Sequence, residues 1–309
     1  MRASRAGLIA LERQRITPGP FARTCVHSID GGPILDDIAS IPETAADDAT
    51  AELYADIRHT LRVPVTNLVW RHLATFDGAL ARVWHGVKPL YLDGRLDADA
   101  AALRSPPGLP RLPPWDRAVL RSAGLDEAAL ASVRNIFANY DATNPRNLLA
   151  LMAVLARLES DDFVPRNAPA HPAAPPPAIP RIGPLPPLLD PASLRPAVLR
   201  AAMRLNDIGL PPGERALVAG VPRHLAHWPG FLALCVDSLE PVAAEIGRSI
   251  EFVYADAHLR ARDFAAALPP LHDGRWSRDV ATALRRFTSV ELIANYIPKV
   301  RVLEAALPD

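Results

Sequence analysis

The histidines offer the first candidate chemistry in this sequence, because imidazole binds metal ions and transfers protons near neutral pH. His224 and His227 form a His-x-x-His pair, which a helix would place on one face. A zinc site needs three or four protein ligands, and no acidic residue with metal-site spacing completes this pair. His72 also stands at the position equivalent to His224 in a repeated stretch of sequence. We therefore expect these equivalent histidines to have a packing role, and we expect no metal site.

Other common catalytic motifs are absent from the sequence. Cys25 and Cys235 lie far apart, so no Cys-x-x-Cys pair supports thiol redox chemistry or a zinc ribbon. The sequence also lacks a Gly-rich phosphate loop, a Gly-x-Ser-x-Gly elbow and a His-Glu-x-x-His motif. These absences argue against nucleotide binding and serine hydrolysis, and we predict no cofactor.

The dipeptide Asn144-Pro145 has two interpretations. Asparagine followed by proline and an apolar run is typical of a helix start, where the Asn side chain caps the first turn and proline fits the first position. The pattern predicts a helix that begins at Pro145 with Asn144 as its N-cap. Free N–H groups at such a helix start also attract anions, so the same place is a candidate site for a carboxylate or a halide.

Glu214 has a structural interpretation in the sequence alone. It follows the breaker Pro211-Pro212-Gly213, which predicts a helix over residues 214–220. An acidic residue in the first turn of a helix is favoured by the helix dipole. Structural stabilisation alone therefore explains its position.

The elements that must position these residues are helices. Apolar residues recur at helical spacing in residues 53–61, 130–137 and 148–158. No stretch of useful length alternates between apolar and polar residues as a β-strand would. Aromatic residues also make up only 6% of the chain, and both observations disfavour a β-rich fold. We therefore predict an all-α protein. Further helical segments are expected at 197–205, 231–239, 242–259, 280–287 and 290–303.

Prolines divide the chain. Ten of the thirty residues from 161 to 190 are proline, which removes backbone donors and prevents a continuous helix. The sequence thus predicts an N-terminal arm over 1–45, a helical unit over 46–160, a Pro-rich linker over 161–190 and a second helical unit over 191–309. A smaller proline-rich break at 105–115 lies inside the first unit.

Charge and hydropathy limit the possible partners. The 34 acidic and 34 basic residues leave no net charge, which argues against nucleic acid as a partner. The first 15 residues contain only a short apolar run around Leu8 and Ile9, so we expect neither a secretory signal nor a membrane span. A cytoplasmic protein is the expectation.

The two helical units contain a repeated stretch. Residues 71–90 and 223–242 align without gaps at an offset of 152 and share eight identities in twenty positions, beginning with Arg-His-Leu-Ala. The repeat predicts duplicated units packed about a pseudo-two-fold axis as a pseudo-dimer. A cleft is expected where such units meet, and we take it as the default site.

Five stretches resemble the group I 2-haloacid dehalogenases, the family that includes the DL-2-haloacid dehalogenases. They are residues 54–64, 73–78, 133–149, 182–190 and 225–229, and they spread over most of the chain. The resemblance implies an all-α pseudo-dimer and a hydrolase without metal or cofactor. It also implies that an aspartate activates a water, which attacks the halogen-bearing carbon and releases halide without a covalent ester on the enzyme.

The family's catalytic positions match this chain only in part. The asparagine before proline, which in the family helps to bind substrate and position water, falls on Asn144. The catalytic aspartate falls on Val221 when counted back from Trp228-Pro229, and on Leu217 when counted forward from Asp190. Neither placement supplies a carboxylate. The nearest acids are Glu214 and, further back, Asp207, and Glu214 is the candidate base near this register.

The family's pocket walls also differ here. The aromatic positions that line the family's channel fall on Val65 and Leu68, and the tyrosine after the Asn-Pro pair falls on Asn147. We expect Val65, Leu68, Asn147, Leu217 and Val221 to contact the substrate in a cavity of altered size and polarity. Val65 and Leu68 also suit the core face of a helix that starts after Pro64.

Two functions follow as hypotheses. The first is a 2-haloacid dehalogenase-like hydrolase, in which water attacks a small 2-halocarboxylic acid. The second is a catalytically altered homologue that binds a small carboxylate or an apolar ligand. Both imply a small carboxylic acid as the partner, with no nucleic acid or membrane involved. A homo-oligomer is left open.

Overall fold

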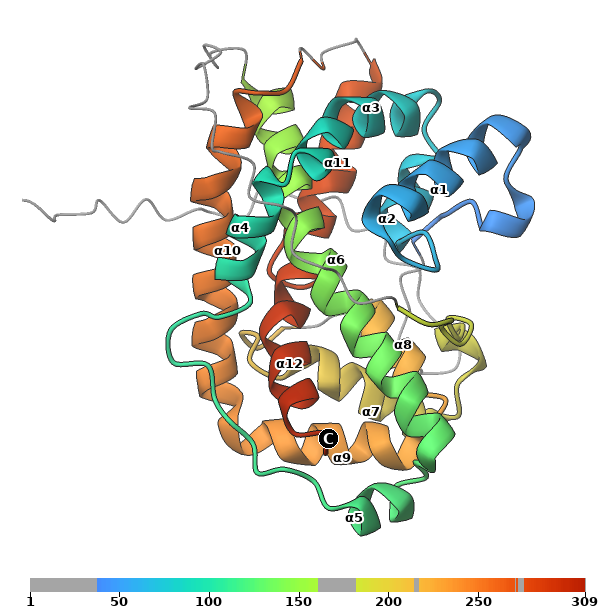
Figure 1. The fold of residues 1–309 in the computed structure, drawn as a ribbon, viewed down its shortest axis with the longest axis vertical. Helices are drawn as coiled ribbons and strands as arrows, with labels where there is room; N and C mark the ends of the chain where they lie inside the picture. Colours follow the sequence, from blue (N-terminus) through green and yellow to red (C-terminus); the bar gives the residue numbers. More distant parts are fainter. Residues whose placement is uncertain (1–37, 161–181, 214–216, 270, 272–274, 309) are drawn as a thin grey trace, which may run out of the picture. The chain divides into compact units, whose positions relative to one another are not determined.

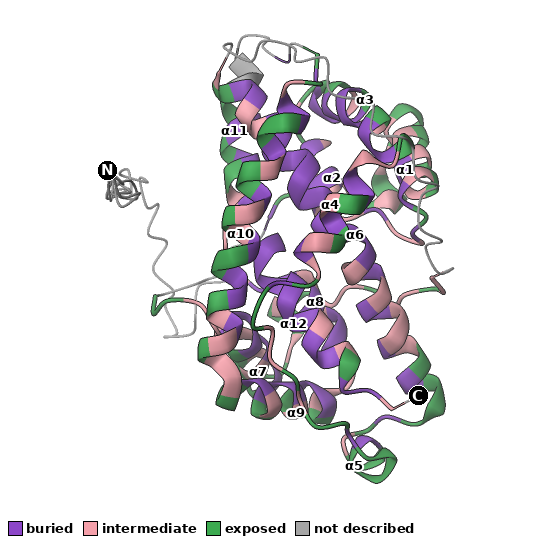
Figure 2. Ribbon diagram, turned by 60° about the vertical axis from the view of Figure 1, so that its left-hand side comes forward, coloured by how far each residue is buried: buried purple, intermediate pink, exposed green. Residues whose placement is uncertain are grey.

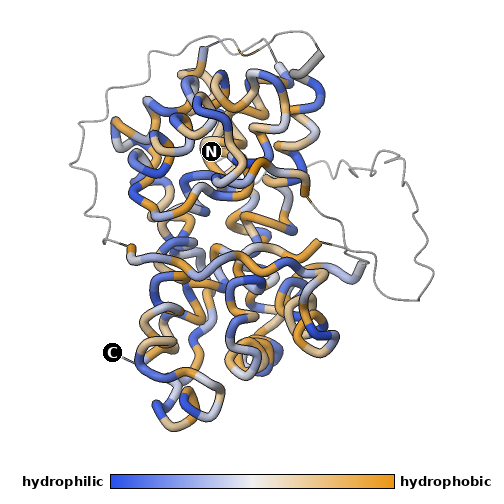
Figure 3. Tube along the Cα trace, turned by 90° about the vertical axis from the view of Figure 1, so that its right-hand side faces the viewer, coloured by the Kyte–Doolittle hydropathy of each residue, from blue (hydrophilic) through white to orange (hydrophobic). Residues whose placement is uncertain are grey.

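The computed structural model describes residues 38–160, 182–213, 217–269, 271 and 275–308 (Figure 1). These residues form helices and irregular chain, with no strand among them, so the all-α prediction is confirmed. Figure 3 shows hydrophilic and hydrophobic residues mixed along the helices, as expected for amphipathic segments. In this part of the chain no helix is long and apolar enough to cross a bilayer.

The helices fall on both sides of the undescribed residues 161–181. Before them lie α1 (Asp48–Leu61), α2 (Leu68–Leu73), α3 (Ala79–Leu92), α4 (Arg95–Leu103), α5 (Arg117–Ser122) and α6 (Glu127–Glu159). After them lie α7 (Pro196–Asp207), α8 (Gly220–Leu225), α9 (Pro229–Leu239), α10 (Ala243–Ala265), α11 (Arg275–Thr288) and α12 (Ile293–Ala305). Three short 3-10 helices complete the set: η1 (Glu43–Ala45), η2 (Pro191–Ser193) and η3 (Glu240–Val242).

Helix α6 is the central element of the fold. It packs against α4 from its own side of the chain and against α10, α11 and α12 from the other side (Figure 1). Residues 142–154 of α6 are buried without interruption, and α12 is buried over most of its length (Figure 2). A helix that is buried on all sides requires neighbours on every side, and these helices supply them.

The predicted helix start at Pro145 is wrong, because Asn144 and Pro145 lie inside α6. The helix begins eighteen residues earlier at Glu127, behind Asp126, whose side chain accepts a hydrogen bond from Ala129 N at 2.8 Å. Proline has no N–H to bond the carbonyl four residues before it, which here belongs to Asp141. Arg104, which caps the C-terminal end of α4, donates from Nε to that carbonyl at 3.0 Å and so replaces the missing bond.

Two other helix predictions are also wrong in part, and for a related reason; the predicted start at Glu214 lies outside the described residues. Helix α2 starts at Leu68 rather than directly after Pro64, and α8 starts at Gly220, leaving residues 217–219 outside any helix. Tertiary partners bind backbone N–H groups in both irregular stretches. Thr66 N donates to Glu43 Oε1 at 2.7 Å, and Ala219 N donates to Asn206 Oδ1 at 3.4 Å.

The segment between α4 and α5 joins the first part of the chain to the second. Trp115 N donates to Ala306 O at 2.8 Å, and its indole N–H donates to Ser238 Oγ at 3.2 Å. Its ring meets Phe231 edge to face, with 5.5 Å between centroids. The predicted break at 105–115 is thus an extended segment held by the second half of the chain.

Candidate functional site

A cavity of about 390 Å³ lies among the described residues. Its walls come from the starts of α2 and α8, one face of α6, parts of α11 and α12, the chain around η1, and residues 185–188. The lining residues are Ile38, Pro42, Glu43, Thr44, Val65, Thr66, Asn67, Leu68, Val69, Arg71, Asn139, Tyr140, Asn144, Asn147, Leu185, Pro186, Pro187, Leu188, Leu217, Val218, Ala219, Gly220, Val221, His224, Phe287, Leu292, Ile293 and Tyr296.

Most of the predicted site residues meet at this cavity. The lining includes Val65, Leu68, Asn144, Asn147, Leu217 and Val221, which are far apart in the sequence. Glu214, the candidate base, lies outside the described residues. Asp207 ends α7 and is absent from the lining. The roles assigned to these residues stay predictions.

The irregular stretches before α2 and α8, together with the first residues of these helices, form two parts of the lining. Residues 65–69 and 217–221 both contribute side chains to it. Each end of α8 lies 152 residues after the corresponding end of α2, which is the offset of the repeated sequence.

One face of α6 supplies amide and hydroxyl groups. Asn144 is 7% exposed and Asn147 is 1% exposed, and Asn147 Oδ1 accepts a hydrogen bond from Tyr91 at 2.8 Å. Asn139 and Tyr140, one to two turns earlier, also line the cavity, as does Tyr296 on α12. Sequence reasoning missed these three residues. The tripeptide Ala-Asn-Tyr at 138–140 and again at 294–296 was the available signal.

Tyr140 and His224 form a hydrogen-bonded pair at the cavity, with 3.0 Å between Tyr140 Oη and His224 Nδ1. Burial lowers the pKa of His224 to about 4, and the nearby His227 and Arg223 act in the same direction. Burial also raises the pKa of Tyr140. Both side chains are therefore uncharged at pH 7. Gly220 makes their approach feasible, because a Cβ there would lie 2.3 Å from Tyr140 Oη.

The equivalent histidines both contact other residues, but with different partners. His72 Nδ1 lies 2.6 Å from Ala39 O, whereas His224 bonds Tyr140. His227 Nε2 contacts Pro187 O at 2.8 Å. In the described part of the chain, no group of three His, Cys, Asp or Glu residues is placed to hold a metal ion.

Two charged side chains line the cavity in the described residues, and they differ in their contacts. Glu43 is occupied at both oxygens, since Oε1 accepts from Thr66 N and Oε2 pairs with Arg58. Arg71 Nε is buried without a hydrogen-bond acceptor. Asn139 Oδ1 and Thr66 Oγ1 are also buried without partners. Buried polar atoms without hydrogen-bond partners are uncommon inside folded proteins, so their presence here indicates a place for a polar ligand or water.

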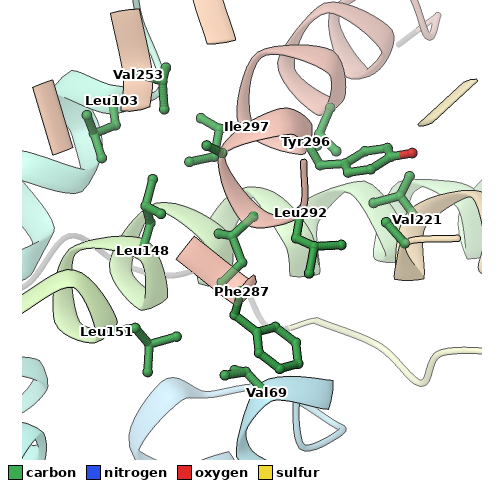
Figure 4. Close-up of a cluster of buried hydrophobic side chains, with 14 of the residues drawn as sticks. Val69, Leu103, Leu148, Leu151, Val221, Val253, Phe287, Leu292, Tyr296 and Ile297 are labelled. Carbon is green, nitrogen blue, oxygen red and sulfur yellow. The ribbon is translucent and has the colours of Figure 1, made fainter. Parts of the chain in front are cut away.

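Apart from Thr44 and Asn67, the remaining walls are apolar. Figure 4 shows the ring of Phe287 beside Val69 and the ring of Tyr296 beside Val221, with Leu292 nearby. An apolar enclosure with a few polar groups strengthens the electrostatic contacts made inside it. The site is therefore suited to a small anionic molecule with an apolar part.

Part of the predicted linker contributes to the site. Leu185, Pro186, Pro187 and Leu188 lie in irregular chain along the cavity. Arg223 Nε donates to Leu189 O at 2.7 Å, and His227 contacts Pro187 O, so α8 and the turn after it hold this segment in place. Proline content predicts the irregular backbone, but nothing in the sequence indicated that it would line the site.

Comparisons with known proteins point to one group of enzymes. No protein-family model matches the chain. A configuration-inverting 2-haloacid dehalogenase of Alcaligenes xylosoxydans xylosoxydans is 28% identical over 246 residues, which cover 75% of this chain and 78% of that protein. An (R)-2-haloacid dehalogenase of Pseudomonas putida is 31% identical over 113 residues, which cover 35% of this chain and 36% of that protein.

Solved structures show the same likeness at the level of the fold. A D-2-haloacid dehalogenase mutant in complex with D-2-CPA has a TM-score of 0.69 at 18% identity, covering 89% of this chain and 98% of the other. A D-2-haloacid dehalogenase with L-LA has a TM-score of 0.68 at 18% identity, with the same coverage. The described helices thus share the fold of these proteins.

Proposed function

Since the chain is a divergent member of the 2-haloacid dehalogenase family, we propose that its cavity binds a small 2-halocarboxylic acid and hydrolyses the carbon–halogen bond. One observation carries the proposal. Asn144 and the five other positions that the family resemblance assigns to the site line one cavity, although they come from three separate parts of the chain.

In the proposed reaction a water molecule displaces the halide. A base removes a proton from the water as its oxygen forms a bond to C2, and the electron pair of the carbon–halogen bond leaves with the halide. The products are a 2-hydroxy acid, a halide ion and a proton. The Asn144 amide is suited to hold the substrate or the water, and Leu217 and Val221 keep bulk solvent from the reacting carbon.

Glu214 is the proposed base. It lies three residues before the lining residue Leu217 in the sequence, and no described lining residue offers an unengaged carboxylate, because Glu43 is bound by Arg58 and Thr66 N. The reaction requires neither a metal nor a cofactor.

The test is halide release from the two enantiomers of 2-chloropropionate. We expect release by the wild-type protein, with Asn144→Ala and Glu214→Gln each lowering kcat/KM by about 10²-fold or more, as expected when a positioning or proton-accepting group is lost. Glu251→Gln, an exposed change on α10, is the matched control and should keep wild-type activity. Release that is unaffected by Glu214→Gln would eliminate Glu214 as the base.

A second candidate function is binding without hydrolysis. It is favoured by the apolar Leu217 and Val221, which occupy the two positions where the family resemblance places its aspartate. If this is correct, the wild-type protein binds 2-chloropropionate without releasing halide, and Leu217→Asp or Val221→Asp gains activity. Halide release by the unmodified protein would exclude this alternative.

The finer architecture is also a proposal. We propose that residues 46–160 and 191–309 are duplicated units packed as a pseudo-dimer, joined by the Pro-rich linker 161–190 and preceded by the arm 1–45. The matching bounds of α2 and α8 and the paired lining stretches support it. A cytoplasmic location and assembly as a homo-oligomer complete the proposal.

A further inference from the structure

Arg71 differs from its counterpart in the repeated Arg-His-Leu-Ala stretch. In the second copy, Arg223 Nε donates to Leu189 O at 2.7 Å and so holds the chain beside the cavity. In the first copy, Arg71 lines the cavity and its buried Nε has no acceptor. A buried guanidinium N–H nearly always finds a partner in a folded protein. The missing partner of Arg71 is therefore expected to come from a ligand.

The surroundings of Arg71 favour an anionic partner. Tyr140 and His224, which feel its charge, are both uncharged at neutral pH. The acidic residue on the described lining, Glu43, has its oxygens engaged by Thr66 N and Arg58. A guanidinium group matches a carboxylate in geometry and can donate two parallel hydrogen bonds to it. A single carboxylate would satisfy both the charge and the unpaired N–H.

The size of the cavity indicates the rest of the ligand. A volume of about 390 Å³ falls within the range of roughly 300–1,000 Å³ that proteins use for drug-sized ligands. A three-carbon 2-haloacid is much smaller than such ligands. The apolar walls at Val69, Val221, Phe287 and Leu292 offer contact to a hydrocarbon chain and nothing to a second charged group (Figure 4).

We infer that the ligand is a 2-substituted monocarboxylic acid whose apolar side chain is longer than that of propionate, and that Arg71 binds its carboxylate. This inference rests on the proposed function for the substituent at C2, and it adds the head-group contact and the length of the chain. Arg71 is a binding residue in this scheme and takes no part in proton transfer.

Binding of the 2-hydroxy acids tests the inference without requiring any reaction. Isothermal titration calorimetry would compare 2-hydroxypropionate, 2-hydroxyhexanoate and 2-hydroxy-3-phenylpropionate with the neutral 2-hydroxyhexanamide. We expect the two larger acids to bind at least ten-fold more tightly than 2-hydroxypropionate, and the amide to bind at least ten-fold more weakly than its acid.

Variants separate the head-group contact from the chain contact. Arg71→Met should weaken all three acids by ten-fold or more and leave the amide unchanged, whereas Arg71→Lys should restore part of the affinity. Arg248→Met, an exposed change on α10, is the control and should behave as wild type. Val221→Phe reduces the cavity and should weaken 2-hydroxyhexanoate while 2-hydroxypropionate is retained.

The outcomes distinguish this inference from the proposed function. If the acids bind in the expected order but no 2-haloacid releases halide, the hydrolase proposal fails and the inference stands. Three results would overturn the inference: equal affinity for the short and long acids, equal affinity for acid and amide, or no binding of any acid. Should Arg71→Met fail to fold, the Arg71→Lys variant and the acid–amide comparison on the wild-type protein still test whether Arg71 binds the carboxylate.

Discussion

His224 shows how burial sets the charge of a residue at this cavity. Its side chain is 5% exposed and contacts Tyr140, and desolvation lowers its pKa from 6.5 to about 4. The unfolded chain therefore binds a proton between pH 6.5 and 4 that the folded chain does not bind. The stability due to neutral His224 is present above pH 6.5 and is lost as the pH falls toward 4.

The pH dependence of unfolding should report this group. Between pH 7 and pH 5 the wild-type protein should lose about 2 kcal/mol of unfolding free energy through His224, in addition to the contributions of other groups. In His224→Gln that part of the loss should vanish. Urea titrations of both proteins at the two pH values provide the measurement, and an identical pH dependence would contradict the assignment.

Sequence resemblance can assign a residue to the site when the residues around it match a known family. It cannot identify a residue such as Arg71, which stands out only because its buried Nε has no hydrogen-bond acceptor. Asn144, Val65 and Leu217 were assigned to the site from matching stretches, and the structure brings them to one cavity. Arg71 was visible in the repeat, but its importance depends on having no acceptor in three dimensions. No sequence pattern contains that information.

At the scale of elements, the start of α8 depends on close contact with α6. A Cβ at Gly220 would lie 2.3 Å from Tyr140 Oη and 3.2 Å from Cζ. Gly86 in α3 is different, because a Cβ there would first meet the flexible side chain of Leu271 at 3.4 Å. An alanine substitution should thus affect stability differently at the two glycines.

Alanine substitutions test this contact. Gly220→Ala should destabilise the protein by about 1–3 kcal/mol through overpacking. Gly86→Ala should leave stability unchanged or raise it by up to about 1 kcal/mol, since alanine is the better helix former. Thermal unfolding followed by circular dichroism compares them. Because the hydroxyl is the nearest atom, the cost of Gly220→Ala should shrink in a Tyr140→Phe background, and an undiminished cost would rule out this contact as its cause.

The spacing of apolar residues predicts that helices form, but it does not predict the residues at which they begin and end. The stripes at 130–137 and 148–158 indicated helices, and both belong to α6. The Asn-Pro pair between them is a typical helix start, yet Arg104 satisfies the carbonyl that proline leaves unpaired, and the helix continues. A contact between α4 and α6 thus overrides a local signal, and local sequence cannot reveal it.

At the scale of the whole molecule, the two parts of the chain share one core. Helix α6 is packed against α10, α11 and α12, and Trp115 is held by Ser238 and Ala306. Salt bridges from Arg260 to Asp99 and from Arg285 to Glu159 also join the parts. The buried apolar residues of the described chain form one cluster that includes residues from both parts.

Separate expression of residues 1–160 and 182–309 should therefore give two polypeptides that do not fold alone. Each would expose the faces that α6 and α12 bury against each other, and such large apolar surfaces lead to aggregation. Co-expression should recover a folded complex with the far-ultraviolet circular dichroism of the intact chain. A cooperative thermal transition in either part by itself would contradict a shared core.

The cavity is shaped by stretches that carry little of the helical framework. Val65 and Leu217 lie in irregular chain, and Leu68 is the first residue of a six-residue helix. Exchanging such side chains alters the shape of the hollow while the long helices keep their neighbours. Point changes at these positions therefore alter which molecules the hollow can accommodate, while the architecture stays the same.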